Sequence, residues 1–101
     1  MDPDLPDLTI ADVVVSTAGR DAGKLFYVLE TDDAWLTLVN GKDRTIEKPK
    51  RKKCKHTRKV LRSDTRVAAK LRSGDKVLNS ELRRDLACLS REMHSNDLGG
   101  F

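Results

Sequence analysis

The sequence predicts a mostly β fold in which a small five-stranded barrel is followed by two short α-helices. Two observations support this prediction. Short apolar runs joined by turn residues fill the first sixty or so positions, and helical periodicity replaces them in the last third. In addition, the apolar runs are more continuous than a sheet with one solvated face requires, so something should cover part of the sheet. At 101 residues, the chain fits one domain with a modest core.

The predicted strands are rich in β-branched, aromatic and other apolar residues, and turn residues separate them. Asn40-Gly41, which follows the third run, is the strongest hairpin signal in the chain. Pro49 interrupts the chain before the last run. Five short strands with tight turns are typical of a small closed or half-closed barrel. The strands are predicted at residues 10–16 (containing VVVS), 25–30 (LFYVLE), 35–39 (WLTLV), 44–47 (RTIE) and 54–61 (CKHTRKVL).

Two helices are predicted after the barrel. The first has cap candidates Ser63 and Asp64 and a stop signal at Gly74. The second begins near Asn79 and Ser80, and its apolar residues are spaced so that they share one helical face. Those residues are Leu82, Leu86, Leu89 and Met93.

These elements predict four segments. An acidic, disordered lead-in precedes the barrel, and a two-helix extension packs on it before a flexible tail. The segments are residues 1–9, 10–62, 63–95 and 96–101.

Positive charge is concentrated in one part of the chain. Lys48 to Arg62 holds nine Lys or Arg in fifteen residues and no Asp or Glu, whereas residues 1–47 carry four basic and ten acidic side chains. Clustered like charges repel one another, and a bound polyanion offsets that cost and releases counterions. The run therefore favours polyanion binding over two other interpretations, a solvated surface that keeps the protein soluble and a nuclear import signal.

The glycine-containing turn between the first two strands resembles the KOW motif, a β-loop-β unit of ribosomal proteins and transcription elongation factors. The match continues through Asn40-Gly41, Arg44 and KPKRKKCKH (48–56), and it covers about residues 10–60. Ala11 and Asn40 depart from the usual pattern, which has Gly and Asp there. The resemblance implies an SH3-like barrel that binds RNA, mostly on the ribosome. It argues against an import signal, because the basic run lies inside a folded-domain pattern. The matching turn residues are Val13, Val14, Ser16, Ala18, Gly19, Arg20, Asp21 and Gly23.

From the charge and the resemblance together we expect RNA contacts along one basic edge. The expected RNA-binding residues are Arg20, Arg44, Lys48, Lys50, Arg51, Lys52, Lys53, Lys55, His56, Arg58 and Lys59. The expected structural turn residues are Gly19, Asp21, Gly23, Asn40 and Gly41, with Asp21 accepting backbone N–H bonds of its own turn.

Three residues leave alternatives open. Arg20 is either a salt-bridge partner or a phosphate contact. Trp35 can pack under a C-terminal helix, which we favour, or stack on a base. Arg44, which follows the predicted hairpin turn, either extends the basic surface or has no part in binding. No aromatic residue is interleaved in the basic run itself, which favours backbone recognition of structured RNA over stacking readout of single strands.

Other classes of function have little support in the sequence. We expect no enzyme, because no nucleophile-base arrangement or phosphate-cradling loop is present. We expect no metal and no cofactor, because Cys54 and His56 lack ligands at paired spacing and lie among positive charges. No export signal or membrane span is recognisable, and Cys54 and Cys88 do not form a disulfide framework, so a cytoplasmic monomer is expected. The remaining alternative is a protein-interaction module of SH3-like type that contacts an acidic partner such as transcription or translation machinery.

Overall fold

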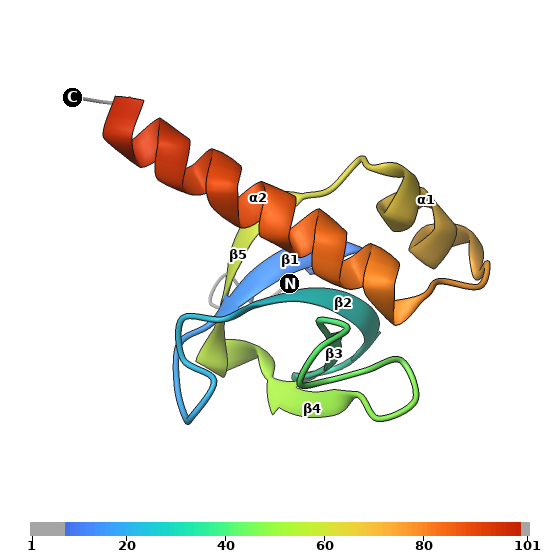
Figure 1. Cartoon of the computed structure of the whole chain (residues 1–101). Helices are drawn as coiled ribbons and strands as arrows, with labels where there is room; N and C mark the ends of the chain where they lie inside the picture. Colours follow the sequence, from blue (N-terminus) through green and yellow to red (C-terminus); the bar gives the residue numbers. More distant parts are fainter. Residues whose placement is uncertain (1–7, 100–101) are drawn as a thin grey trace.

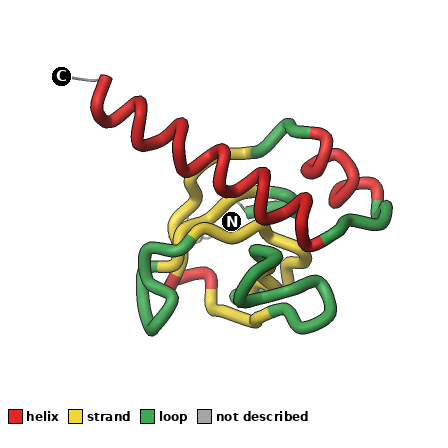
Figure 2. The backbone as a smooth tube through the Cα atoms, viewed as in Figure 1, coloured by secondary structure: helices red, strands yellow, loops and turns green. Residues whose placement is uncertain are grey.

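The computed structural model describes the backbone of residues 8–99 and the side chains of residues 8–93. Five antiparallel strands form one strongly curved, barrel-like sheet in the order β4-β3-β2-β1-β5, and two helices follow (Figure 1). A short 3-10 turn, η1, links β4 to β5 (Figure 2). The elements are β1 Asp12–Ser16, β2 Leu25–Asp32, β3 Trp35–Val39, β4 Lys50–Lys53, η1 Cys54–His56, β5 Thr57–Arg62, α1 Arg66–Ser73 and α2 Asn79–Gly99. The predicted class, mostly β with five strands and then two helices, is confirmed.

The sheet has an apolar layer on each face, because side chains of a strand alternate between its two sides. On the concave side, Phe26, Leu36 and Leu38 are almost fully buried, together with Val14, Val28 and Cys54. On the other side, Tyr27 and Val39 are buried beneath the helices. The expectation that something covers the outside of the sheet is therefore correct.

Helix α2 lies across β1 and β2, and its C-terminal half extends beyond the sheet (Figure 1). Leu82 and Leu86 insert into the layer between helix and sheet, and Leu89 packs at its border. Met93, the last residue of the predicted stripe, is exposed. The helix continues to Gly99, although a flexible tail was expected from residue 96. The sequence has no proline in this region, and glycine is a common residue at a helix end.

Helix α1 is capped by Thr65, whose hydroxyl accepts a hydrogen bond from the Ala68 N–H, rather than by the expected Ser63 or Asp64. Gly74 ends the helix with a φ of 76°, as expected. The Thr65 hydroxyl also donates to the carboxylate of Asp85 in α2 at 2.7 Å. The Tyr27 hydroxyl donates to the same oxygen, so one carboxylate joins β2, α1 and α2. Burial and this carboxylate together raise the pKa of Tyr27.

Two of the five predicted strands have different positions. Residues 44–47 form part of a long loop, residues 40–49, because Asn40 Oδ1 accepts from the Lys42 and Arg44 N–H groups and so closes a compact turn. The Ile46 N–H donates to Asn79 Oδ1 at the start of α2 instead of to a strand. The fourth strand therefore begins only at Lys50. Residues 54–56, expected as the start of the fifth strand, form η1. Seven residues of the predicted lead-in, 1–7, lie outside the described residues.

Candidate nucleic-acid interface

Strand β4 divides its four cationic residues between two faces. Lys50 pairs with Leu38 and Lys52 pairs with Leu36, so both lysines share the concave face with the apolar core. Arg51 and Lys53 alternate with them and are exposed on the outer face. A continuous run of positive charge in the sequence is therefore two separate groups in the structure.

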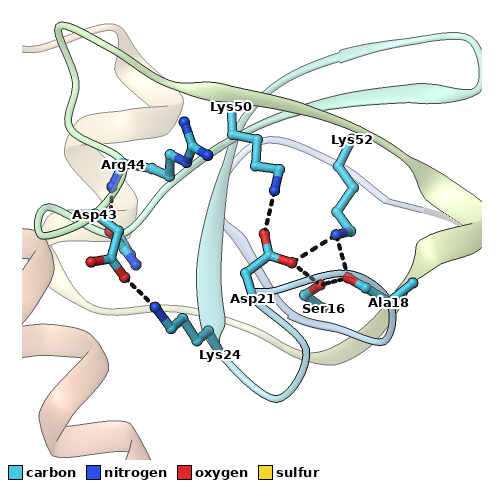
Figure 3. Close-up of polar contacts among 9 residues, drawn as sticks. Ser16, Ala18, Asp21, Lys24, Asp43, Arg44, Lys50 and Lys52 are labelled. Carbon is cyan, nitrogen blue, oxygen red and sulfur yellow. Dashed lines mark hydrogen bonds and ion pairs between the residues drawn. The ribbon is translucent and has the colours of Figure 1, made fainter.

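The inward lysines converge on one carboxylate (Figure 3). Lys50 Nζ lies 2.7 Å from Asp21 Oδ2, and Lys52 Nζ lies 2.8 Å from Asp21 Oδ1. Lys52 also donates to the Ala18 carbonyl at 2.7 Å, and the Ser16 hydroxyl donates to Asp21 Oδ1 at 2.7 Å. Burial alone would raise the pKa of Asp21, but the hydrogen bonds from Lys50, Lys52 and Ser16 outweigh it and hold that pKa far below its ordinary value.

This arrangement corrects two expectations. The Asp21 carboxylate accepts from three side chains, not from backbone N–H groups of its own turn. Lys52 is 7% exposed and is bonded on the inside of the barrel, so its ammonium is not presented to a ligand. Both lysines instead fasten the turn of residues 17–24 to β4. Gly19 and Gly23 have positive φ in this turn.

The outward cations of β4 lie over an aromatic ring. Trp35 lies directly opposite Lys53 on the neighbouring strand, and the Lys53 ammonium is 5.5 Å from the centre of the ring. The Arg51 guanidinium is 5.2 Å from the same centre and 3.5 Å from an oxygen of the exposed Asp32. Trp35 is 38% exposed, so the favoured prediction that it packs under a helix is wrong.

The turn that carries Arg20 lies beside η1. The Thr17 N–H donates to the His56 carbonyl at 2.9 Å, and Lys52 reaches Ala18 from the adjoining strand. Arg20, Lys55 and His56 are all exposed. We give the name basic edge to the exposed basic residues of β4, η1 and this adjoining turn, which are Arg20, Arg51, Lys53, Lys55 and His56.

Two further predicted contacts, both on β5, are not brought to that surface. Arg58 lines a cleft of about 160 Å³ with Val15 and Met93, on the side covered by α2. Lys59 lies 3.3 Å from the buried carboxylate of Asp12. These two residues of β5 therefore belong to other parts of the surface.

Arg44 and Lys48 are exposed on the loop of residues 40–49. Figure 3 shows the Arg44 side chain extending on the same side as Lys50. The loop is held to α2 at Asn79, whose Oδ1 accepts from the Ile46 N–H and whose Nδ2 donates to the Glu47 carboxylate. Arg83 also donates to the Gly41 carbonyl at 2.6 Å. The loop that carries these two cations is therefore anchored to α2 and leads directly into β4.

The sequence did not single out Asp32, and for Trp35 it favoured packing under a helix over stacking on a base. Trp35 is separated from Lys53 by 18 positions in the sequence, and Asp32 is separated from Arg51 by 19. The signal that could have found them is strand register, because residues directly opposite on an antiparallel pair share a face. Register could not be assigned correctly while the fourth strand was placed at residues 44–47.

Together, the fold and this surface define a small barrel-like β domain with a helical extension and a cationic outer edge. No protein-family model matches the chain. No curated protein matches its sequence. Within residues 8–99, no helix combines the length and apolar composition needed to cross a membrane. Cys54 is buried, which raises the pKa of its thiol, and the described side chains form no group of three or more His, Cys, Asp or Glu able to hold a metal ion.

Proposed function

We propose that this protein binds structured RNA through the basic edge. The observation that supports the proposal most is the division of charge on β4. The lysines that face inward are paired with Asp21, whereas Arg51 and Lys53 face solvent, as do Lys55, His56 and Arg20 on the adjoining segments. A sequence that needed positive charge only for solubility would have no reason to group the outward cations on one outer strand.

Phosphate neutralisation is the physical basis of the proposed binding. Each RNA phosphate that meets a Lys or Arg releases condensed counterions, which gives affinity without base recognition. Arg51 can bond a phosphate through two N–H groups, whereas Lys53 and Lys55 act as point charges. Such contacts follow the shape of a duplex backbone and suit folded RNA.

Ribosomal RNA as the target, translation as the process and the cytoplasm as the compartment are the narrower parts of the proposal. They are supported by the KOW resemblance of residues 10–60, which also supports an SH3-like description of the barrel. Strand β4 is an outer strand of the sheet, so a large ligand can approach it from one side.

The test compares two variants that lose the same charge. The first carries Arg51→Gln, Lys53→Gln and Lys55→Gln, and the control carries Arg66→Gln, Arg84→Gln and Arg91→Gln, three exposed positions on the helices. Lys50 and Lys52 are left intact because their loss would disrupt the Asp21 cluster. The readout is a gel shift with a duplex-containing RNA hairpin across a salt series.

We expect the first variant to lose most of its affinity for the hairpin. Its plot of log K against log salt should be flatter than that of the wild type by about two to three units of slope, because three cations are lost. The control should bind like the wild type, apart from a small general loss. Equal weakening by both variants, or full affinity of the first, would contradict the proposal. Material that co-purifies from a lysate and survives ribonuclease would instead favour an acidic protein partner.

A further inference from the structure

We propose that Trp35 is a stacking site for an unpaired nucleobase at the end of the basic edge. The inference rests on the proposed function and adds a ligand to it, namely RNA in which an unpaired nucleotide adjoins a duplex. It concerns one ring, the two cations beside it and the strand pair that holds them.

The position of Trp35 differs from that of the other aromatic residues in the described part of the chain. Phe26 and Tyr27 are 0% and 1% exposed and fill the two apolar layers of the sheet. Trp35 is 38% exposed on the outer face of the sheet, although it is the largest apolar side chain of the protein. The inward face of the same strand is already filled by Leu36 and Leu38. The core therefore does not require an aromatic ring at this position.

The surroundings of the ring match the chemistry of a nucleotide. A nucleotide combines a flat, largely apolar base with an anionic phosphate, and an exposed aromatic ring with cations close to it offers a partner to both. The charged groups of Arg51 and Lys53 lie over the ring, 5.2 and 5.5 Å from its centre, so a base that stacks on the ring takes the place of a cation, which can then meet the phosphate. Both belong to the basic edge, so a base on Trp35 would continue from phosphates bound along β4.

The base must be unpaired, because in a duplex both faces of each base are covered by its neighbours. Proteins that recognise RNA by stacking use loops, bulges and ends, where a base can be turned outward. Stacking is tolerant of base identity because every base has a π-face. The expected ligand is therefore defined by an unpaired position next to a stem, not by a particular sequence.

Trp35 is the only tryptophan in the chain, so fluorescence excited selectively at tryptophan reports on this ring and not on Tyr27. The experiment titrates the full-length protein with two RNAs, a duplex that carries one bulged nucleotide and the same duplex fully paired. We expect both RNAs to bind, with tighter binding and strong quenching of Trp35 emission for the bulged RNA only.

Two substitutions separate stacking from packing. Trp35→Phe keeps a ring and should retain most of the affinity for the bulged RNA. Trp35→Leu removes the π-face and should lower that affinity about fivefold to a hundredfold, with little effect on the paired duplex. Because the ring is uncharged, the salt slope of Trp35→Leu should stay parallel to the wild type, whereas Arg51→Gln should flatten it by about 0.7 to 0.9 units.

The failures of the two proposals are distinguishable. If both RNAs bind with a steep salt slope but without quenching, and Trp35→Leu binds like the wild type, the stacking site is wrong and the basic edge stands. If Trp35→Leu weakens the binding of both RNAs equally and lowers the melting temperature of the protein, the ring stabilises the pairing of β3 with β4, and the stacking site is again wrong. If neither RNA binds, the proposed function fails and the stacking site fails with it.

Discussion

At the residue scale, Asp21 determines what two of the basic residues can do. The sequence identifies it as a turn residue but cannot show that its partners are Lys50 and Lys52, which lie 29 and 31 positions away. Both oxygens of the carboxylate are used, and its side chain is 11% exposed. The cations on the concave face of β4 therefore stabilise the fold, whereas those on its outer face are exposed to solvent.

Replacing Asp21 by Asn should destabilise the protein by on the order of 3 kcal/mol at pH 7, because it leaves the buried Lys52 without its counter-charge. The wild-type contribution has a defined pH dependence. Because the folded-state pKa of Asp21 lies below the unfolded value of about 4, the stabilisation is complete above that value and is lost as the pH falls toward the folded pKa. Melting curves between about pH 2 and pH 7 test this.

The variant should show a weaker loss of stability in acid than the wild type, since Asn does not titrate. Asp43→Asn is the matched control, because Asp43 also pairs with a lysine, Lys24, but both side chains are about half exposed. That substitution should change the melting temperature little. Equal effects of the two substitutions would mean that the Asp21 cluster is not a buried structural feature.

Asp32 places a negative charge beside the basic edge, 3.5 Å from Arg51. Replacing it by Asn should strengthen RNA binding by roughly twofold to fivefold at low salt, because a repelling charge is removed and Arg51 is released. The gain should shrink as salt is added. Asp75→Asn, an exposed position next to α1, serves as the control. Weaker RNA binding by Asp32→Asn would show that Arg51 needs this partner to face the ligand.

At the element scale, the loop of residues 40–49 and the start of α2 form one unit. Gly41 lies so close to α2 that a Cβ at this position would be 2.2 Å from the Asn79 carbonyl oxygen and 3.0 Å from Leu82 Cβ. The hairpin signal Asn40-Gly41 is correct as a turn signal. The reason for the glycine, close approach of a helix more than thirty positions later, is not visible in local sequence.

Two alanine substitutions separate backbone strain from this close approach. Gly23 and Gly41 have φ values of 89° and 77°, so both substitutions carry the strain of a left-handed residue, about 1–2 kcal/mol. Only Gly41→Ala adds a clash with α2, which should bring its total to about 2–5 kcal/mol. Within the described residues, no atom lies within 4 Å of a Cβ at Gly23. Chemical denaturation measures the free energy of unfolding of both variants. Equal losses of stability would mean that α2 moves away from Gly41→Ala without a loss of free energy.

The apolar stripe of α2 is the other link between helix and sheet. Leu86 is 7% exposed and packs in the layer that includes Tyr27 and Val39. Leu86→Ala should cost about 2–5 kcal/mol, a large share of the stability of a domain of this size. The exposed Ala87→Ser on the same helix is the control. An unchanged melting temperature for Leu86→Ala would show that α2 is not part of the cooperative unit.

At the scale of the whole molecule, the features that depend on composition and periodicity can be predicted from the sequence, whereas strand register cannot. The first three strands, the second helix and the covered outer face follow from apolar patterning, and the first helix follows from its cap and stop signals; all of these signals are local. The fourth strand was misplaced because KRKK has no apolar residue to mark it. It forms a strand because β3 supplies the hydrogen bonds and Asp21 pairs with both of its inward lysines. The concentration of charge was visible, but its division between two faces depends on that strand.

RNA affinity should depend steeply on salt and weakly on sequence. Four cations of the basic edge, Arg20, Arg51, Lys53 and Lys55, are exposed, and Arg44 and Lys48 lie on the adjoining loop. If these residues neutralise about four to six phosphates, log K should fall against log salt with a slope of roughly −3 to −5. Fluorescence anisotropy of a labelled hairpin across a salt series gives the slope. A slope near −1 would mean that most of these cations never reach a phosphate. A tenfold preference for one sequence over another on the same hairpin shape would mean that base edges are read, which neither phosphate contacts nor a single stacking ring can do.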